Sequence, residues 1–405
     1  MASMVNLRGS SNTALIPIDW KKKYLKDSHE KDPLKPFYKK DSIVVTEWNL
    51  TGKKGDTIVV PIVGLPDGAG VTDDGDYDGD VGSVSVYDFP VRVHEHGRAL
   101  GVNGKMSVKS PAFDARAVLI DALTQWRGMF DARAAIDALS GLKLHKLGGN
   151  VLGASGLALE GSTQIECVNQ VIPAYTQGAT AKRYYCGGQT SAGTLQSRVA
   201  NIASLTTATN YLMGPEVVKD VRKLARKTVD ASGNLINPIQ PININGRMLY
   251  VMLISLEQGK AVRNSTGWKN AHYYADIRGM ENSILSGQIG VIDGVMLVET
   301  DLVHQRSGAN GILGPEYFDS TTVTCASGVS VHRALFLGKN AVARAMGEAQ
   351  EVVPFFADNA KTKPAARVSS IYAFKKIAKN SSTTGSSSLV NDSEMGCIVV
   401  DTCVS

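Results

Sequence analysis

The hydrophobic pattern of the chain is weak up to residue 48 and strong from Gly55 onward. The first 48 residues mix lysines and prolines with few apolar side chains, so residues 1–48 are predicted to form an extended arm. The runs GDTIVVPIVGL and SVSVYDFPVRVHEH then predict the two antiparallel strands of a β-hairpin. The apolar parity changes between Val86 and Phe89, which predicts a β-bulge near Asp88.

The connection between these two strands, PDGAGVTDDGDYDGD, is too polar to be buried. An isolated two-stranded ribbon is only marginally stable in water, so the hairpin requires a surface to lie on. The arm likewise has too few apolar residues for a core of its own. We therefore expect both segments to find their partners on other copies of the same chain, arranged symmetrically.

The strongest helical pattern spans residues 110–139. Ser110 is a suitable N-cap, and Pro111 occupies the first helical position, where its missing N–H costs nothing. Apolar side chains three and four residues apart form one stripe, which we expect to be the core face of the helix: Leu119, Leu123, Trp126 and Phe130.

Later residues alternate between helical and strand patterns, which favours a compact α/β or α+β lobe. An amphipathic helix is predicted from Pro215 to Thr228, with a basic outer face and Val217, Val218, Val221, Leu224 and Ala225 inward. RMLYVMLI and GVIDGVMLVET are predicted strands, the second with a turn at Asp293 and Gly294. RALFLGKNAVARAMG is predicted to form a strand and a short helix, and MGCIVVDTCVS a final strand.

The formal net charge of +5 lies entirely in residues 1–40, and the remaining residues are formally neutral. Such a basic segment is expected to meet an acidic neighbour or DNA. The five cysteines are scattered and never spaced as CxxC, which argues against a disulfide framework and a zinc site. No secretory signal or membrane span is recognisable, so we expect a soluble protein made in the cytosol, with no membrane partner.

Acidic residues are concentrated in the hairpin tip, DDGDYDGD at residues 73–80. Asp74, Asp76 and Asp78, followed by a glycine, match the opening of a calcium loop, although Ser85 stands where the bidentate glutamate belongs. Calcium binding is therefore kept as an alternative. The preferred hypothesis is an inter-subunit contact between acids and lysines: Asp67, Asp73, Asp74, Asp76, Asp78 and Asp80 with Lys21, Lys22, Lys23 and Lys26.

Two histidines, His94 and His96, lie on the same side of a predicted strand and could ligate a metal, but no third ligand follows nearby. His145, His272, His304 and His332 show no spacing to a nucleophile or carboxylate. The sequence therefore predicts no enzyme, no catalytic residue and no cofactor.

Several stretches resemble, in order, the major capsid proteins of tailed bacteriophages related to coliphage N-four. They are GDTIVVPIVGLPDGAGV, SPAFDARAVLIDALTQWRGMFDARAAIDALSG, MLYVMLI, YYADIRGMENSILSGQIGVIDGVMLVET, RALFLGKNAVARAMG and IVVDT. The chain departs from the family at the tip, where DYDGD replaces a glutamate-bearing sequence. A second departure follows the strand MLYVMLI, where SLEQ replaces a His-Pro pair.

The resemblance implies the Hong Kong 97-type capsid fold, with an N-terminal arm, an extended loop, a peripheral domain with a long spine helix, and an axial domain. The implied divisions are an arm at 1–48, the loop at 49–106, the peripheral domain at 107–212 with spine helix 110–139, the axial domain at 213–332, and a return to the peripheral domain at 333–405.

The implied function is structural: hexamers and pentamers that close an icosahedral phage head around double-stranded DNA, with portal, scaffolding and decoration proteins as partners. The alternatives are an encapsulin-like cellular compartment, or, from a different class, a calcium-binding module or enzyme.

Overall fold

A computed structural model describes somewhat more than half of the chain. The described residues are 32–39, 42–46, 55, 57–63, 86–102, 115–140, 168–169, 183–205, 207–228, 237–244, 246–269, 290–303, 305–306, 329–357, 363–378 and 394–404.

These residues fall into two compact units. The described parts of the first unit lie in Gly97–Arg127 and Gln350–Ser369, and the other described residues belong to the second unit. Four elements contain residues of both units: the strand β4 (His94–Gly101), the helix α2 (Ala115–Ser140), and the strands β13 (Val342–Phe356) and β14 (Pro364–Lys376).

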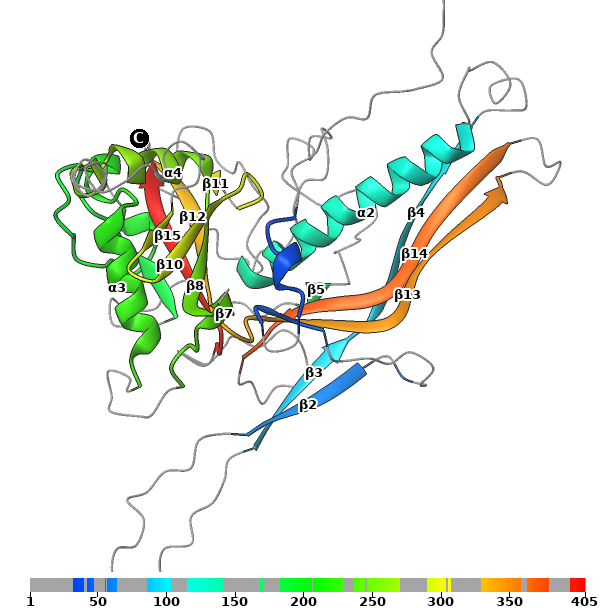
Figure 1. Cartoon of the computed structure of the whole chain (residues 1–405), viewed down its shortest axis with the longest axis horizontal. Coiled ribbons are helices and arrows are strands. Elements are labelled where there is room, and N and C mark those ends of the chain that lie inside the picture. The colour runs from blue at the N-terminus through cyan, green and yellow to red at the C-terminus, as the bar shows by residue number, and fades with distance from the viewer. Residues whose placement is uncertain are drawn as a thin grey trace, which may run out of the picture. The chain divides into compact units, whose positions relative to one another are not determined.

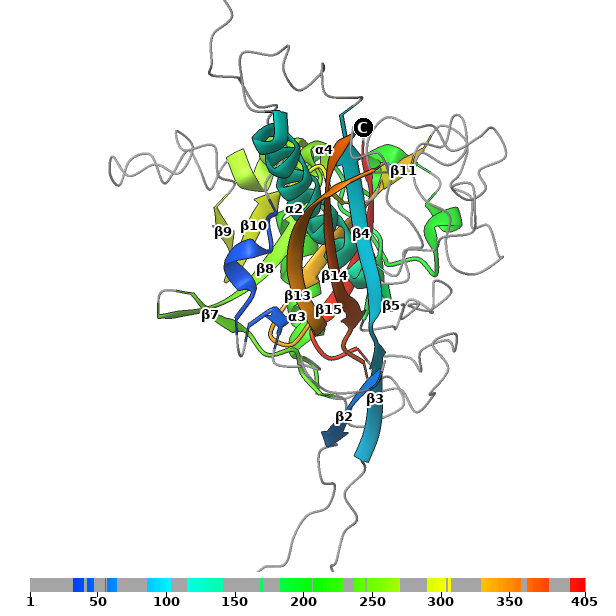
Figure 2. The same ribbon diagram turned by 90° about the vertical axis from the view of Figure 1, so that its right-hand side faces the viewer.

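An eight-stranded mixed sheet forms the centre of the second unit (Figures 1 and 2). Its main order is β6-β15-β12-β8-β10-β9, while β11 also pairs with β12 and β7 with β8. The bounds are β6 Tyr184–Cys186, β7 Ile242–Ile244, β8 Arg247–Ile254, β9 Val291–Ile292, β10 Val295–Glu299, β11 Gln305–Arg306, β12 Ser330–Leu337 and β15 Cys397–Val404. β12 is antiparallel to both β15 and β8, whereas β8 and β10 are parallel.

Both faces of this sheet are covered, which explains why β15 is buried at every residue. On one face, Ala334, Phe336 and Ile398 share a core with α3 (Pro215–Arg226) and with Val262 of α4 (Leu256–Asn264). Residues of the opposite parity face the C-terminal end of α2, where the Cys397 thiol donates to the Leu139 carbonyl.

The N-terminus of α4 is capped by neighbouring residues, whereas that of α3 is capped by a side chain distant in the sequence. Ser255 and Gln258 form a capping box at the start of α4, each side chain accepting from the other residue's backbone N–H. The N-cap of α3 is Gly214, and the side-chain oxygen of Gln189 accepts from the Glu216 N–H in its place. A Cβ at Gly214 would lie 2.1 Å from the Gln189 amide, so this remote cap requires glycine.

The second sheet has the order β1-β13-β14-β4, with β5 (Val168–Asn169) beside β14. β1 (Val44–Val45) runs parallel to the start of β13, and β2 (Thr57–Val63) pairs with β3 (Val86–Arg92) in a separate ribbon. Three 3-10 turns complete the described elements: η2 Lys35–Phe37, η4 Ile202–Ser204 and η5 Ala208–Asn210.

The first unit has a small core between α2 and the sheet. Leu123 is fully buried against Ala366 and Val368, and Leu119 and Trp126 pack around them. The guanidinium of Arg98 lies 5.5 Å from the centre of the Trp126 ring, covering its face.

Most local patterns in the second unit predict the observed elements. The five inward residues of α3 are all buried, RMLYVMLI forms β8, and the final strand is β15. The turn at Asp293 and Gly294 is confirmed, with φ of 47° and 74°, as a two-residue hairpin with two left-handed residues requires.

The short helix predicted after RALFLGKN is wrong, because AVARAMG opens the long strand β13. Alanine favours helix locally, but Ala343 and Ala345 are buried on one side of the strand by the β2–β3 ribbon. A contact between distant parts of the chain therefore overrides the local preference.

Two glycines allow a matched test of close packing in the second unit, because one lies against a neighbouring backbone and the other is exposed. A Cβ on Gly188 would lie 2.0 Å from the Tyr211 carbonyl carbon, whereas a Cβ on Gly128, exposed in α2, meets nothing within 4 Å. We expect Gly188→Ala to lower the free energy of unfolding by about 3 kcal/mol or more, and Gly128→Ala to raise it by about 0.5–1 kcal/mol. Urea unfolding of unassembled chains measures both, and similar values for the two variants would contradict the close approach at Gly188.

Candidate functional site

The β2–β3 ribbon has two faces with different surroundings. Its strands pair without interruption from Thr57 opposite Arg92 to Val63 opposite Val86. On one face, Ile62, Phe89 and Val91 are buried. On the other face, apolar side chains remain open, with exposed fractions of 53% for Val59, 62% for Val63 and 60% for Val86.

The inner face of the ribbon rests on its own chain. Ile62, Phe89 and Val91 pack against Ala343, Ala345, Ala373 and Ile377. Because the alanines are small, the two strands of the ribbon can approach this part of the sheet closely.

A lysine fixes the ribbon from the sheet side. The Lys375 ammonium donates to the Pro90 carbonyl at 2.5 Å and lies 4.9 Å from the centre of the Phe89 ring. Burial lowers the pKa of Lys375 to about 8. The ribbon base is thus held by apolar packing and by one buried cation.

The structure corrects the expected bulge in the hairpin and adds contacts at the roots of hairpin and arm that the sequence did not predict. No bulge occurs at Asp88, which pairs directly with Pro61, and the change of parity arises because Val86 is exposed. The described roots of both segments also find partners within their own chain. For the arm, Leu34, Ile43 and Val44 are fully buried, and Val44 pairs with Val342.

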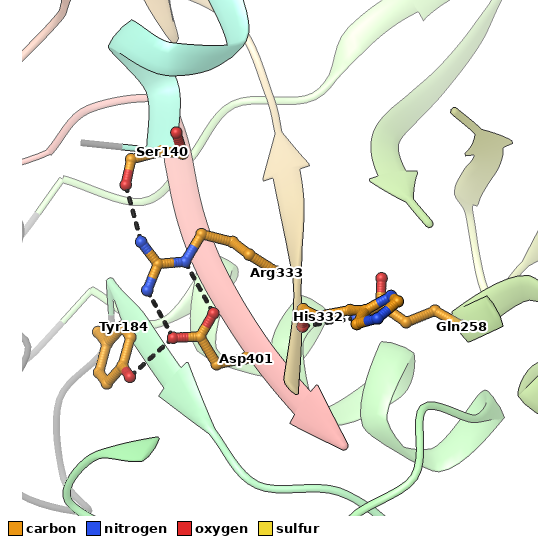
Figure 3. A network of polar contacts seen from close by, with 6 residues as sticks. All are labelled: Ser140, Tyr184, Gln258, His332, Arg333 and Asp401. Atoms are coloured by element: carbon orange, nitrogen blue, oxygen red, sulfur yellow. Dashed lines mark hydrogen bonds and ion pairs between the residues drawn. The ribbon is translucent and has the colours of Figure 1, made fainter. Parts of the chain in front are cut away.

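A buried ion pair connects β12, β15, β6 and α2 (Figure 3). Arg333 donates from Nε and Nη2 to the two carboxylate oxygens of Asp401, at 2.8 and 2.7 Å, and from Nη1 to the Ser140 carbonyl at 3.0 Å. The Tyr184 hydroxyl donates to the same carboxylate at 2.9 Å. Arg333 and Asp401 are 3% and 1% exposed, so removing either one leaves the other charged and buried, at a cost of about 3–5 kcal/mol.

The adjacent residue His332 points to the opposite side of β12 (Figure 3). Its Nδ1 lies 2.7 Å from the Ser255 hydroxyl, and the Gln258 amide donates to the His332 carbonyl and to the Thr402 hydroxyl. Burial lowers the pKa of His332 to about 4, although the Glu257 and Asp301 carboxylates act in the opposite direction. The imidazole is therefore neutral near pH 7.

The Ser255 hydroxyl and His332 Nδ1 are as close as a catalytic nucleophile and its base, but their surroundings indicate a structural role. Ser255 is fully buried, and its oxygen already accepts from the Gln258 N–H as the cap of α4. With the described residues in place, that oxygen is not exposed to solvent.

His94 and His96, the two histidines considered as possible metal ligands, both lie at the start of β4. His96 stacks on Phe130 with ring centroids 4.0 Å apart. Within the described residues, no three His, Cys, Asp or Glu side chains are grouped so that they could hold a metal ion. Cys186, Cys397 and Cys403 are buried, and burial raises the pKa of Cys397 to about 11. None of the described helices has the length and apolar content that a membrane crossing requires.

The other candidate residues lie in two places. The acidic tip, including the alternative calcium ligands Asp74, Asp76 and Asp78, and the lysines Lys21, Lys22, Lys23 and Lys26 lie outside the described residues. In α2, Leu123 and Phe130 are buried, while Leu119 and Trp126 are half-buried.

The sequence pattern gives little sign of the polar network. Arg333 and Asp401 are 68 residues apart, and neither has a motif around it. The S-x-x-Q spacing of Ser255 and Gln258 directly after a buried strand is the one available signal, because it is typical of a capping box.

His332 predicts a loss of stability in acid. An unfolded chain protonates this histidine near pH 6.5, whereas the folded chain does so only near pH 4, so unfolding takes up a proton between these values. Stability from this group is complete above pH 6.5 and falls by on the order of 3 kcal/mol as pH drops to 4. We expect His332→Asn to reduce this pH dependence in urea unfolding measured at pH 7, 6 and 5. Equal pH dependence in the wild type and His332→Asn would contradict the assignment.

The comparisons with known proteins are consistent with this fold. Residues 14–405 match a family described as phage capsid protein. The structure is similar to the capsid of Ralstonia phage GP4, with a TM-score of 0.70 and 19% identity, covering 100% of this chain and 99% of that one. It is also similar to the acid-stable capsid of Helicobacter pylori bacteriophage KHP30, with a TM-score of 0.66, 13% identity and 100% of both chains covered.

A third similar structure is the capsid of cyanophage Pam1, with a TM-score of 0.64, 18% identity and 99% of both chains covered. No curated protein sequence matches the chain. At these identities the structural likeness establishes an α+β phage capsid fold, while the family match extends over nearly the whole sequence. The chain therefore belongs to the phage capsid protein family and is a structural protein of a phage capsid.

Proposed function

We propose that the chain self-assembles into hexamers and pentamers, which close an icosahedral phage head around double-stranded DNA. The observation that carries this proposal is the β2–β3 ribbon, which is fixed on one face and carries three exposed valines on the other, beside the exposed Asp88 and Arg92. A contiguous exposed apolar surface on a soluble chain usually marks an interaction site. We infer that a neighbouring copy covers Val59, Val63 and Val86.

The ribbon suits such a contact energetically. Because the three valines are 53–62% exposed, covering each one contributes about 1 kcal/mol, and covering all three contributes roughly 3 kcal/mol per contact. Because Lys375 and the alanines already fix the base of the ribbon, little conformational entropy is lost when a neighbour covers the outer face. Because the same contact recurs between every pair of neighbours in a closed ring, its modest free energy is added once for each pair.

The finer assignment is a Hong Kong 97-type subunit. The helix α2 has 26 residues and is about 39 Å long, which fits a spine helix. In this proposal the arm is 1–48, the extended loop 49–106, the peripheral domain 107–212 and 333–405, and the axial domain 213–332. The phage capsid family match favours a head over an encapsulin-like compartment. Portal, scaffolding and decoration proteins are the proposed additional partners.

A second contact is electrostatic. The hairpin tip carries Asp67, Asp73, Asp74, Asp76, Asp78 and Asp80 with no lysine or arginine between them, and the arm carries Lys21, Lys22, Lys23 and Lys26. We propose that the tip of one copy meets the arm of another. Exposed pairs contribute only about 0–1 kcal/mol each, so this contact is expected to set geometry and salt dependence more than strength.

The apolar contact is tested by Val59→Thr, Val63→Thr and Val86→Thr combined. Threonine keeps the β-branched shape, and each side chain is already mostly exposed, so the unassembled chain should retain its stability. Burying three unpartnered hydroxyls in the contact costs about 1 kcal/mol or more each, which raises the concentration needed for assembly by a hundredfold or more. Sedimentation velocity and electron microscopy, with the phage's own assembly partners present, measure the outcome.

The matched control replaces three exposed apolar residues elsewhere in the second unit: Leu195→Thr, Met248→Thr and Val291→Thr. This control should assemble at the wild-type concentration. Normal assembly of the ribbon variant, or equal loss in both variants, would reject the ribbon as the contact.

The electrostatic contact is tested by a double-mutant cycle. One variant replaces the six tip aspartates with asparagine, a second replaces the four arm lysines with glutamine, and a third combines both sets. If the two segments meet, each single set weakens assembly at low salt and the combined loss is much smaller than the sum. Additive losses would show that tip and arm act on different partners.

A further inference from the structure

The cations of α3 and its C-cap fall into two groups: those that form ion pairs and those that form none with the described residues. Lys219 forms an ion pair with Glu216 at 2.6 Å, and Arg222 pairs with Asp293. Lys223, Arg226 and Lys227 are all exposed. In the part of the chain that the structure describes, no carboxylate lies within ion-pair distance of any of them. We call these three residues the α3 basic patch.

This concentration of charge has a local cost. Lys223 and Lys227 are four residues apart, and Lys223 and Arg226 three apart, so the like charges lie on one side of the helix and repel by a few tenths of a kcal/mol per pair. Attraction to the negative C-terminal end of α3 accounts for one or two cations there. A third on the same side gains less and repels both others.

The patch is presented from a fixed backbone. The Ile239 N–H donates to the Ala225 carbonyl at 2.8 Å, and the Lys227 N–H donates to the Leu224 carbonyl at 3.2 Å. Beneath the patch, Leu224 and Ala225 are buried in the sheet core. The last turn of α3 is therefore held on its inner side while its cations point to solvent.

We propose that the α3 basic patch binds the phosphate backbone of double-stranded DNA. This inference rests on the proposed function, since packaged DNA is the polyanion that a phage head contains. Exposed side chains of α3 include no apolar residue, because its valines and leucine all face the core. Protein interfaces usually have an apolar centre, whereas DNA interfaces are polar and strongly positive, so the surface fits DNA better than an acidic protein segment.

The test is binding of a labelled mixed-sequence DNA duplex to the full chain, followed by fluorescence anisotropy over a range of NaCl concentrations. Each phosphate contact contributes about 0.9 to the slope of log K against log salt. The variant Lys223→Gln, Arg226→Gln, Lys227→Gln should therefore bind more weakly and show a slope smaller by about 2–3. The single variants Arg226→Gln and Lys227→Gln should each reduce it by about 0.9, which keeps the test valid if the triple variant folds poorly.

The control removes the same charge elsewhere, with Lys219→Gln, Lys260→Gln and Lys363→Gln. Lys219 and Lys260 are each paired with a glutamate on their own helix, and Lys363 also has a partner. This variant should keep a slope close to that of the wild type. Equal reductions in the two triple variants would show that net charge, and not the patch, governs binding.

Two further outcomes overturn the proposal. Unchanged DNA binding with lost assembly in the patch variant would assign the patch to an acidic protein neighbour. Wild-type chains that form closed shells but bind no duplex would reject the DNA contact while leaving the proposed shell function intact. Failure of wild-type chains to form shells with their partners would instead count against the proposed function itself.

Discussion

The position of β12 between β15 and β8 is the constraint on which the second unit depends. Seven of the eight residues of β12 are buried, so each of its faces must be covered and each polar group must find a partner. On one side, His332 meets Ser255 and α4, and on the other, Arg333 reaches Asp401 and the last carbonyl of α2. Two consecutive residues of one strand therefore connect both layers to the sheet.

The ribbon illustrates a different balance between internal and external contacts. Its inner face is satisfied by Phe89 against small alanines and by the Lys375 contact to Pro90, so the base is held before any neighbour arrives. Its outer valines stay 53–62% exposed among the described residues. Because the ribbon is already ordered on its own chain, its outer face can contact a neighbour without a separate folding step.

Local patterns predicted the elements whose neighbours are close in the sequence. α3 and the β9–β10 hairpin follow from spacing and turn residues, because their periodicity and their φ requirements are local. The nature of β13 did not follow, since Ala343 and Ala345 acquire their strand role only from a ribbon more than 250 residues earlier. The pair of Arg333 and Asp401 escaped for the same reason, as strand register brings together residues that share no motif.

The order of strands in the eight-stranded sheet has a consequence for synthesis. β15 lies between β6 and β12, yet it follows both in the sequence, and β6 by more than 200 residues. A nascent chain that has not reached residue 397 therefore leaves one apolar edge of β12 unpaired, and among the described strands β6 then lacks its partner. Unpaired apolar edges invite aggregation. Subunits that leave the ribosome before β15 inserts would be the ones most in need of a chaperone, and the supply of competent subunits would depend on that final insertion.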